Sequence, residues 1–465
     1  MNRNELKRLS KNELIRLVLD LARRVEALEQ DNARLRKDSS TSSKPPSSDI
    51  VKPPSGRTRG GQGRKRSIGG QPGHEKHERE PFAPEDVDDV IEYSVDNCPD
   101  CGGRMRDAPG WGRVLQQVEL VQRPFRITEH RALGYWCPHC RVHLEAVLPQ
   151  GVERGGLFGP RMSALVAYLK GGCHASYATI QAFLADILGV AVSTGFLAKV
   201  VDKASQALAL SYDELGHALA AQPWLNVDET GHKDCGKKHW TWCFRAPEYT
   251  WFRIHASRGS DVLRDVLGES FGGVLGADYF SAYHKYAGEC DVRMQFCLAH
   301  LIRDVRFLTT LPDKATRAYG ERVLEVIKEL FGVIHAKGSM KPARFQWALE
   351  KARRKVILKA RGAPNRSEAQ NIAARFRDNA AAYFEFITSP GVEPTNNLAE
   401  QAIRHVVIDR KVTQGTRGSR GRRWCERIWT TMATCAQRGG SPFEFLAQAV
   451  RASFSGKPPP SLLTT

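Results

Sequence analysis

Hydrophobic and polar positions follow two different periods along this chain, and the first is helical. Between positions 14 and 35, apolar residues recur at alternating spacings of four and three, interrupted by one asparagine. This seam consists of Leu14, Val18, Leu21, Val25, Leu28, Asn32 and Leu35. Valine at a positions and leucine at d positions favour a parallel pair of helices, and one asparagine at an a position fixes their register. We therefore expect residues 1–37 to form a coiled coil that makes the protein a homo-oligomer, at least a dimer. A helix packed on its own domain is the alternative.

The second pattern is that of short apolar strands, two of which end in acids. Residues 224–227 precede Asp228 and Glu229, and residues 273–277 precede Asp278. Between them lie two strand-like segments, 239–245 and 249–254, and a helical pattern at 260–267. Three antiparallel strands, a helix and a fourth strand are typical of a ribonuclease-H-like α/β core. The chain would then be a multidomain α+β protein, although fold order alone does not fix a function.

A third acid occurs much later, where Asn397 can cap a helix whose first turn carries Glu400. Oxygen ligands suit Mg²⁺ or Mn²⁺, and two such ions can clamp the attacking and leaving oxygens of a phosphoryl displacement. We expect Asp228, Asp278 and Glu400 to converge on such metals. Neighbouring strand residues point to opposite faces, so either Asp228 or Glu229 faces the site, and we favour Asp228. Asp228 could instead cap a turn, and Glu400 could complete a capping box with Asn397 or pair with Arg404.

Helical patterns fill the segments on either side of this core. Residues 162–210 predict helices with caps at Ser176 and at Ser193 or Thr194, separated by a turn at Gly189. The arrangement resembles a DNA-binding helix-turn-helix domain over 155–215, with three candidate contacts to DNA in its second helix. These are Thr194, Lys199 and Lys203. An ordinary helical hairpin is the alternative. Residues 312–392 have helical spacing as well and predict an insertion between the second and third acids.

The charge balance indicates a polyanionic partner. Among 465 residues the net charge is +18, which favours nucleic acid. Residues 38–85 predict a disordered basic linker that grips phosphates or serves only as a solvated tether. Its candidate DNA contacts are Arg57, Arg59, Arg64, Lys65 and Arg66. A second basic run, with glycines at 415, 418 and 421, predicts a flexible loop beside the acids. Its candidates are Arg404, Arg410, Lys411, Arg417, Arg420, Arg422 and Arg423. No apolar run reaches the length of a membrane span and the start is polar, so we expect a cytoplasmic protein, associated with the nucleoid when bound to DNA.

Two C-x-x-C pairs stand out among eleven cysteines. Cys98, Cys101, Cys137 and Cys140 have the spacing of a four-cysteine structural Zn²⁺ site, and Gly102 can take the left-handed turn that follows a knuckle. We expect a zinc ribbon over 86–150, with strands at 114–121 and 126–135 between the pairs. A redox pair or free thiols are the alternative. Cys297 and His300, three residues apart, have no second pair, which favours a structural or DNA-positioning role for His300.

Several phrases of the sequence resemble a known family. They are Asn226-Val227-Asp228-Glu229-Thr230, Gly276-Ala277-Asp278-Tyr279, Thr395-Asn396-Asn397-Leu398-Ala399-Glu400, Cys297-Leu298-Ala299-His300, and two phrases of the linker at 43–49 and 69–74. With the cysteine-rich and basic segments, they are similar to bacterial transposases of the insertion-sequence-66 family. The resemblance covers nearly the whole chain. It implies a DDE-type DNA transposase in which Asp228, Asp278 and Glu400 are the matching acids.

This resemblance implies binding of element ends, metal-dependent DNA cleavage, and attack of the exposed 3′-hydroxyl on target DNA. The catalytic core would span 220–311 and 393–455, with a tail at 456–465, and small accessory proteins of the same element are possible partners. A metal-dependent nuclease that cuts without joining is the rival enzyme. A DNA-binding regulator or architectural protein with inert acids is the rival from another class.

Overall fold

The computed structural model describes residues 9–35, 80–94, 96–97, 99–104, 106, 114–121 and 124–463. The chain divides into two compact units, Pro54–Glu129 and the remainder. The basic segment 51–70 and Cys98 lie outside the described residues, so the predictions made for them stay predictions. No helix in the described part of the chain is long and apolar enough to cross a membrane.

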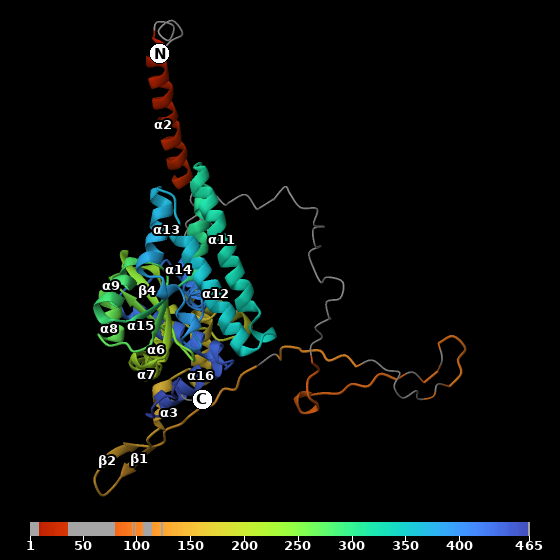
Figure 1. Cartoon of the computed structure of the whole chain (residues 1–465). Coiled ribbons are helices and arrows are strands. Elements are labelled where there is room, and N and C mark those ends of the chain that lie inside the picture. Colours follow the sequence, from red (N-terminus) through yellow and green to blue (C-terminus); the bar gives the residue numbers. More distant parts are fainter. Residues whose placement is uncertain are drawn as a thin grey trace. The chain divides into compact units, whose positions relative to one another are not determined.

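The predicted amphipathic helix near the N-terminus is present as α2 (Lys11–Leu35), the red helix of Figure 1. None of its residues is buried, and its seam is open: Val18 is 62% exposed, Leu28 69% and Leu35 87%. Its outer charges contact a helix of the same unit, because Arg34 Nη2 lies 2.6 Å from Glu368 Oε1. Among the described residues of one chain, nothing apolar covers the seam, and the coiled coil remains a prediction.

The unit 54–129 contains little regular structure among its described residues. A short 3₁₀ helix, η2, spans Pro84–Asp86, and Asn97 pairs with Arg104 in an isolated bridge across the first cysteine knuckle. Gly102 has a positive φ of 71°, as predicted. The expectation of a strand at 114–121 is wrong, because this segment forms no ladder. In the other unit, β1 (Gly134–Cys137) begins eight residues later than predicted and pairs antiparallel with β2 (Val142–Glu145).

A helical layer follows, close to the pattern in the sequence. It comprises α3 (Gln150–Gly155), α4 (Pro160–Gly171), α5 (Tyr177–Leu188), α6 (Thr194–Ala207), α7 (Ala209–Ala218) and η3 (Leu219–Ala221). Ser176 and Ser193 cap α5 and α6 by accepting hydrogen bonds from the backbone N–H groups of Thr179 and Phe196. Gly189 takes the left-handed turn between the two helices.

The centre of the fold is a five-stranded sheet in the order β5-β4-β3-β6-β7. Its strands are β3 (Trp224–Asp234), β4 (Lys237–Arg245), β5 (Thr250–His255), β6 (Val274–Ala277) and β7 (Arg293–Phe296). β3, β4 and β5 are antiparallel, as predicted, whereas β6 and β7 run parallel to β3. Alternation along β3 divides the core: Leu225 and Val227 face one apolar cluster, and the opposite face of the sheet contributes Cys243 and Phe252 to the other.

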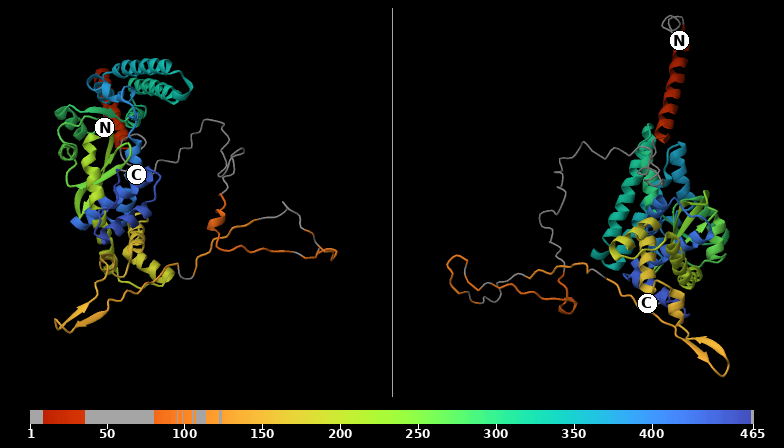
Figure 2. Two further views of the ribbon diagram at one scale, coloured as in Figure 1. Left: turned by 90° about the horizontal axis from the view of Figure 1, so that it is seen from below. Right: turned by 180° about the vertical axis from the view of Figure 1, so that it is seen from behind.

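Helices cover both faces of this sheet. α8 (Ser260–Leu267) and α9 (Ser281–Cys290) pack on the face of Val227, and α10 (Leu298–Leu308) follows β7. The predicted helical insertion consists of α11 (Lys314–His335), η4 (Lys337–Ser339), α12 (Pro342–Arg361), α13 (Ser367–Asp378), η5 (Ala381–Tyr383) and η6 (Glu385–Ile387). Figures 1 and 2 show α11 and α12 as a long pair lying side by side.

The other face of the sheet is covered by α14 (Asn397–Thr413), α15 (Ser419–Gln437) and α16 (Pro442–Phe454), together with α4 and α6. The predicted flexible basic loop is mostly helix, because α14 extends to Thr413 and α15 begins at Ser419. The short loop between them is held against β3: the N–H of Thr416 donates to Lys233 O at 2.8 Å, and the N–H of Cys235 donates to Thr416 O at 2.9 Å. Backbone pairing therefore fixes this loop to the sheet.

Substitution of Gly415 would test how closely the loop between α14 and α15 packs against β3. Its φ is +98°, and a Cβ atom there would lie 2.2 Å from Lys233 O. We expect Gly415→Ala to lower the free energy of unfolding by about 1–3 kcal/mol, because strain and a backbone clash add. Gly288→Ala is the matched control, since Gly288 lies within α9 and a Cβ there meets nothing within 4 Å. That control should be neutral or stabilising by up to about 1 kcal/mol. Urea denaturation would measure both, and equal effects would contradict the prediction.

Candidate active site

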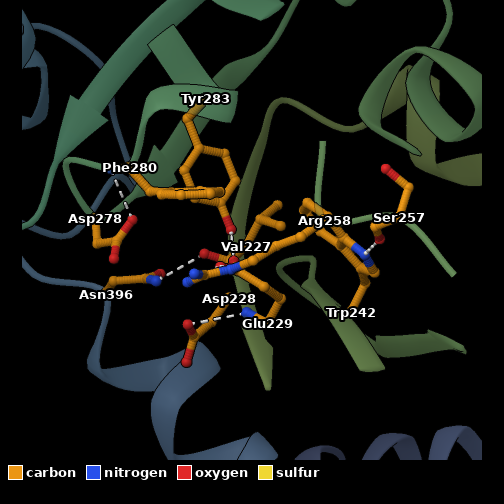
Figure 3. Close-up of polar contacts among 10 residues, drawn as sticks. All are labelled: Val227, Asp228, Glu229, Trp242, Ser257, Arg258, Asp278, Phe280, Tyr283 and Asn396. Carbon is orange, nitrogen blue, oxygen red and sulfur yellow. Dashed lines mark hydrogen bonds and ion pairs between the residues drawn. The ribbon is translucent and has the colours of Figure 1, made fainter. Parts of the chain in front are cut away.

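Two acids of the candidate site are placed by neighbouring parallel strands. β3 and β6 pair with Asn226 opposite Gly276, so Asp228 and Asp278 each lie two residues beyond the last paired position. The strands approach closely at this point, since a Cβ on Gly276 would lie 2.4 Å from Asn226 Oδ1. Figure 3 shows Asp228 and Asp278 on the left of the view, with Asn396 between them. The N–H of Phe280 donates to Asp278 Oδ1 at 3.0 Å and orients that carboxylate.

The third acid is brought by α14, whose N-terminus is anchored to β3. Asn396 Nδ2 donates to the carbonyl of Val227 at 2.8 Å, one residue before Asp228. Its N–H donates to Cys297 Sγ at 3.1 Å. Asn396, rather than the predicted Asn397, occupies the N-cap position, and its side chain bonds to the strand instead of capping the helix. Glu400 therefore lies in the first turn of a helix anchored to β3, where its charge acts on Asp228.

Negative charge is concentrated at this point. Burial raises the pKa of Asp228 well above its usual range, and the charges of Glu229, Asp278 and Glu400 raise it further. Burial also raises the pKa of the Asp278 carboxyl. Carboxylates from three separate elements thus repel one another, and a bound cation would relieve that repulsion. Their oxygens are the donors that Mg²⁺ takes, so the residues fit a divalent ion.

Glu229, next to Asp228, points to the other face of the sheet and is already paired. Arg258 Nε donates to Glu229 Oε1 at 2.8 Å, and the hydroxyl of Tyr283 donates to Glu229 Oε2. The guanidinium of Arg258 lies over the rings of Trp240 and Phe280, at 4.5 and 4.0 Å from their centroids. Burial, then the charge of Asp278, raises the pKa of Glu229 to about 7. This alternation supports Asp228 as the acid that faces α14.

A second donor set adjoins Glu400. The ligand atoms of Cys297, His300 and Glu400 lie within 4.8 Å of one another, a thiol, imidazole and carboxylate set that suits zinc better than Mg²⁺. Glu400 Oε1 lies 3.6 Å from His300 Nδ1, and Arg303 Nη2 lies 3.5 Å from Glu400 Oε2. His300, predicted to contact DNA, is only 8% exposed and lies against this carboxylate. No local pattern pointed to Arg258 or Arg303, whose roles depend on contacts between distant elements.

The other predicted DNA contacts are distributed unevenly. Thr194 and Lys199 are exposed on α6, whereas Lys203 Nζ donates to the carbonyl of Arg154. Along α14, Arg404 and Lys411 are exposed, and Arg410 donates to Thr230 Oγ1 at 3.0 Å. Beyond it, Arg417 and Arg423 are exposed, Arg420 lies 3.5 Å from Asp202, and Arg422 pairs with Asp234.

Comparison with known proteins decides the family. Residues 155–423, more than half of the chain, match the family described as "Transposase IS66 family". The chain belongs to this family. It is an insertion-sequence transposase, which agrees with the resemblance seen in the sequence. Residues 96–141 match the zinc-finger binding domain of transposase IS66, and residues 1–80 match a family of unknown function.

Two relatives of the transposase are proteins of Sinorhizobium fredii (strain NBRC 101917 / NGR234). The uncharacterized protein y4qI is 25% identical over 84% of this chain and 77% of its own length. The uncharacterized protein y4hP is 24% identical over 80% of this chain and 73% of its own length.

The zinc-finger match supports structural Zn²⁺ in the transposase, and its second knuckle is well formed. The N–H of Cys140 lies 3.4 Å from Cys137 Sγ, and backbone N–H groups of Cys140 and His139 lower the pKa of the Cys137 thiol. Arg141, directly after this pair, has a positive φ of 54°, the counterpart of Gly102 after the first pair. Amide groups turned toward sulfur in this way favour the thiolate that a zinc ion needs.

The neighbouring acids on β3 should have opposite effects on the stability of the transposase. In buffer without added Mg²⁺ or Mn²⁺, Asp228→Asn removes like-charge repulsion and should raise the free energy of unfolding by about 0.5–2 kcal/mol. Glu229→Gln replaces one of the two acceptor oxygens by an NH₂ group, which leaves either Arg258 or the buried hydroxyl of Tyr283 without its acceptor, and should lower the free energy of unfolding by about 1–3 kcal/mol. Urea denaturation of the two variants would measure this difference. Destabilisation of equal size in both would mean that the two carboxylates have equivalent surroundings.

Proposed function

We propose that this transposase cuts DNA at the ends of its element and joins the exposed 3′-hydroxyl to target DNA, with Asp228, Asp278 and Glu400 as its catalytic acids. One observation carries the proposal: β3, the residue directly after β6 and the first turn of α14 contribute one carboxylate each, and burial together with the charges of the neighbouring acids raises the pKa of Asp228 well above its usual range. Acids from separate elements that shift one another's pKa in this way are more typical of functional sites than of structural cores.

The sheet supports a ribonuclease-H-like core. Three antiparallel strands followed by two parallel ones, in the order β5-β4-β3-β6-β7, place the first acid on the central strand and the second on its parallel neighbour. The helices 312–392 would be an insertion between the second and third acids. Residues 1–37, 38–85, 86–150 and 155–215 would serve as coiled coil, basic linker, zinc ribbon and helix-turn-helix.

A divalent metal, Mg²⁺ or Mn²⁺, would be held by the three carboxylates. When bound, it would supply Lewis-acid activation of water or a 3′-hydroxyl and stabilise the charge that develops on phosphorus. The chain's own residues prepare the site. Asn396 fixes Glu400 beside β3, the N–H of Phe280 orients Asp278, and the ion pair with Arg258 keeps Glu229 on the opposite face.

Binding of DNA would extend beyond the acids. We propose Cys98, Cys101, Cys137 and Cys140 as the zinc ligands of the domain at 96–141. The exposed Thr194 and Lys199 on α6 would approach a DNA groove, and Arg404, Arg417 and Arg423 would contact phosphates. The two rival functions, a nuclease without joining activity and a DNA-binding regulator, differ from the proposal in whether the acids cut DNA and whether the product is joined.

Cleavage and joining by an Asp278→Asn variant test the catalytic assignment. The substrate is a linear duplex carrying the element's end, incubated with plasmid DNA and Mg²⁺ and scored for nicking and for joining. We expect the variant to lose both reactions by at least about 10²-fold, because one metal ligand is lost. Asp378→Asn, an exposed aspartate at the end of α13, is the matched control and should keep both reactions.

Each other outcome selects a rival. Nicking without joining by the wild-type protein would favour the nuclease. Tight binding of the end with no nicking, repeated after addition of any small proteins encoded by the element, would favour the regulator. A fully active Asp278→Asn variant would remove Asp278 from the catalytic set.

The open seam of α2 supports a dimer through the predicted coiled coil. Val25→Glu with Leu28→Glu places charges at consecutive a and d positions and should convert dimers to monomers. Leu19→Glu is the control, because Leu19 is 57% exposed and lies outside the seam. Light scattering of the full chain would measure the mass. If the double variant kept the mass of the wild type, the seam would not be the contact between protomers.

A further inference from the structure

A pocket of about 520 Å³ lies beside the β3–β4 hairpin and is strongly basic. Here it is called the hairpin pocket. Its lining comprises Gly231, His232, Lys233, Gly236, Lys238, Arg410, Lys411 and Gln414. Four of these residues carry permanent positive charge, and none is acidic. Two of them, Lys233 and Lys238, were not among the DNA contacts predicted from the sequence.

The positive charge of the hairpin pocket has no counter-ion within the described part of the chain. Lys233 and Lys238 lie directly opposite each other in the β3–β4 ladder, an arrangement of like charges that destabilises a sheet. Arg410, half-buried, donates only to neutral acceptors, Thr230 Oγ1 and the carbonyl of Gly231. The one nearby carboxylate, that of Asp234, is already bound by Arg422.

His232, which also lines the pocket, adds no charge of its own. Burial, together with nearby cations including Arg410 and Arg422, lowers the pKa of His232 to about 4, so its imidazole is neutral at physiological pH. An anion entering the pocket would therefore meet four cations and no competing carboxylate. It would also relieve the repulsion between Lys233 and Lys238.

The walls of the pocket are preorganised. The loop 414–418 is joined to β3 by the backbone hydrogen bonds between Thr416 and Lys233 and between Cys235 and Thr416. Thr416 Oγ1 and the N–H of Gly418 also donate to Asp234 Oδ1, at 2.7 and 2.8 Å. Binding would then cost little ordering of the backbone.

Two of the elements that line the hairpin pocket, β3 and α14, also carry two of the three proposed catalytic acids. Lys233 lies five residues after Asp228 on β3, which at the rise of a strand is about 16 Å. Arg410 lies ten residues after Glu400 on α14, about 15 Å along the helix. The pocket and the acids therefore occupy two positions along one strand and helix pair, about 15 Å apart.

We propose that the hairpin pocket binds backbone phosphates of the DNA strand that leads away from the phosphate being cut. This inference rests on the proposed function, which places that phosphate at Asp228, Asp278 and Glu400. At 3.4 Å per nucleotide along a stacked strand, a separation of about 15 Å corresponds to about four or five nucleotides. The pocket would set the register of the strand at the acids and would read no bases.

Salt dependence of DNA binding provides the first test. The variant Lys233→Gln with Lys238→Gln is compared with the wild-type chain on a duplex carrying the element's end, in buffer without Mg²⁺ or Mn²⁺ so that no cleavage occurs while the structural zinc is kept. If both lysines contact phosphates, the slope of log affinity against log salt should fall by about 1.8 for duplex contacts, or about 1.4 for a single strand. Arg410 is left intact because it also bonds to β3.

A pair of lysines elsewhere is the matched control. Lys351→Gln with Lys359→Gln makes the same change in net charge on exposed positions of α12. The slope should change less in this control than in the pocket variant. Equal changes would show that only net charge matters and would overturn the proposal. Unchanged urea midpoints for both variants would verify that folding is intact.

A second experiment, with uncharged methylphosphonates in place of phosphates, identifies which phosphates of the DNA contact Lys233 and Lys238. Methylphosphonates replace single phosphates, one position at a time, and each DNA is bound to the wild-type and pocket variants. Binding to the wild-type chain should weaken most at phosphates about four or five nucleotides from the cleaved position, and these substitutions should have no further effect on the variant. Additive losses at every position would contradict the proposal.

The outcome is separable from that of the proposed function, because binding without metal needs no chemistry. If the protein cut and joined DNA but methylphosphonates weakened binding equally in the wild-type chain and the lysine variant, the proposal for the hairpin pocket alone would be overturned. If methylphosphonates weakened binding only in the wild-type chain but the protein cut no DNA, the pocket would stand as a DNA-binding site and the catalytic proposal would be overturned.

Discussion

Repulsion among carboxylates that share one small region is the constraint on which much of this structure depends. Burial raises the pKa of Asp228, and the nearby charges of Glu229, Asp278 and Glu400 raise it further. Unaided, such a cluster would separate or take up protons. It persists because the backbone around it is tied down: β3 pairs with β6 up to Asn226, and Asn396 bonds to Val227. An unfavourable arrangement such as this repulsion persists where the surrounding packing and hydrogen bonds fix the geometry.

The same region separates two neighbouring acids by strand alternation alone. Glu229 faces Tyr283 and Arg258, and the rings of Trp240 and Phe280 hold that arginine in place. Asp228 faces the layer of α14. A slip of one residue between β3 and β4 would exchange the two side chains. The aromatic residues of the hairpin, which fill the core on the Glu229 face, therefore also determine which acid is offered to α14.

Local signals predicted much of this architecture. Residues 260–267 form a helix with the predicted bounds, Ser176 and Ser193 are caps, and Gly102 takes the left-handed turn, since each depends on nearby residues. The errors arose where distant segments compete for the same groups. Asn396 bonds to β3 and displaces Asn397 as the cap, and pairing with Lys233 orders the loop that its glycines indicated to be flexible. The acids lie 50 and 122 residues apart in sequence, so their convergence was predicted from the order of strands and helices and from the family resemblance, and not from any local spacing.

Negative and positive side chains lie at different positions along β3 and α14. Glu400 lies in the first turn of the helix and Asp228 near the middle of the strand, whereas Lys233 lies at the end of the strand and Arg410 and Lys411 in the last turn of the helix. A polyanion such as DNA would be repelled by the acids in the absence of metal ions, so its approach needs cations close by but not at the same atoms. Placing both groups on one rigid pair of elements solves this problem, because the helix and strand fix the distance between the attracting and the repelling charges. Backbone pairing of Thr416 with Lys233 and Cys235 holds the loop at 414–418 against β3 and so fixes the end of the pair where the cations lie.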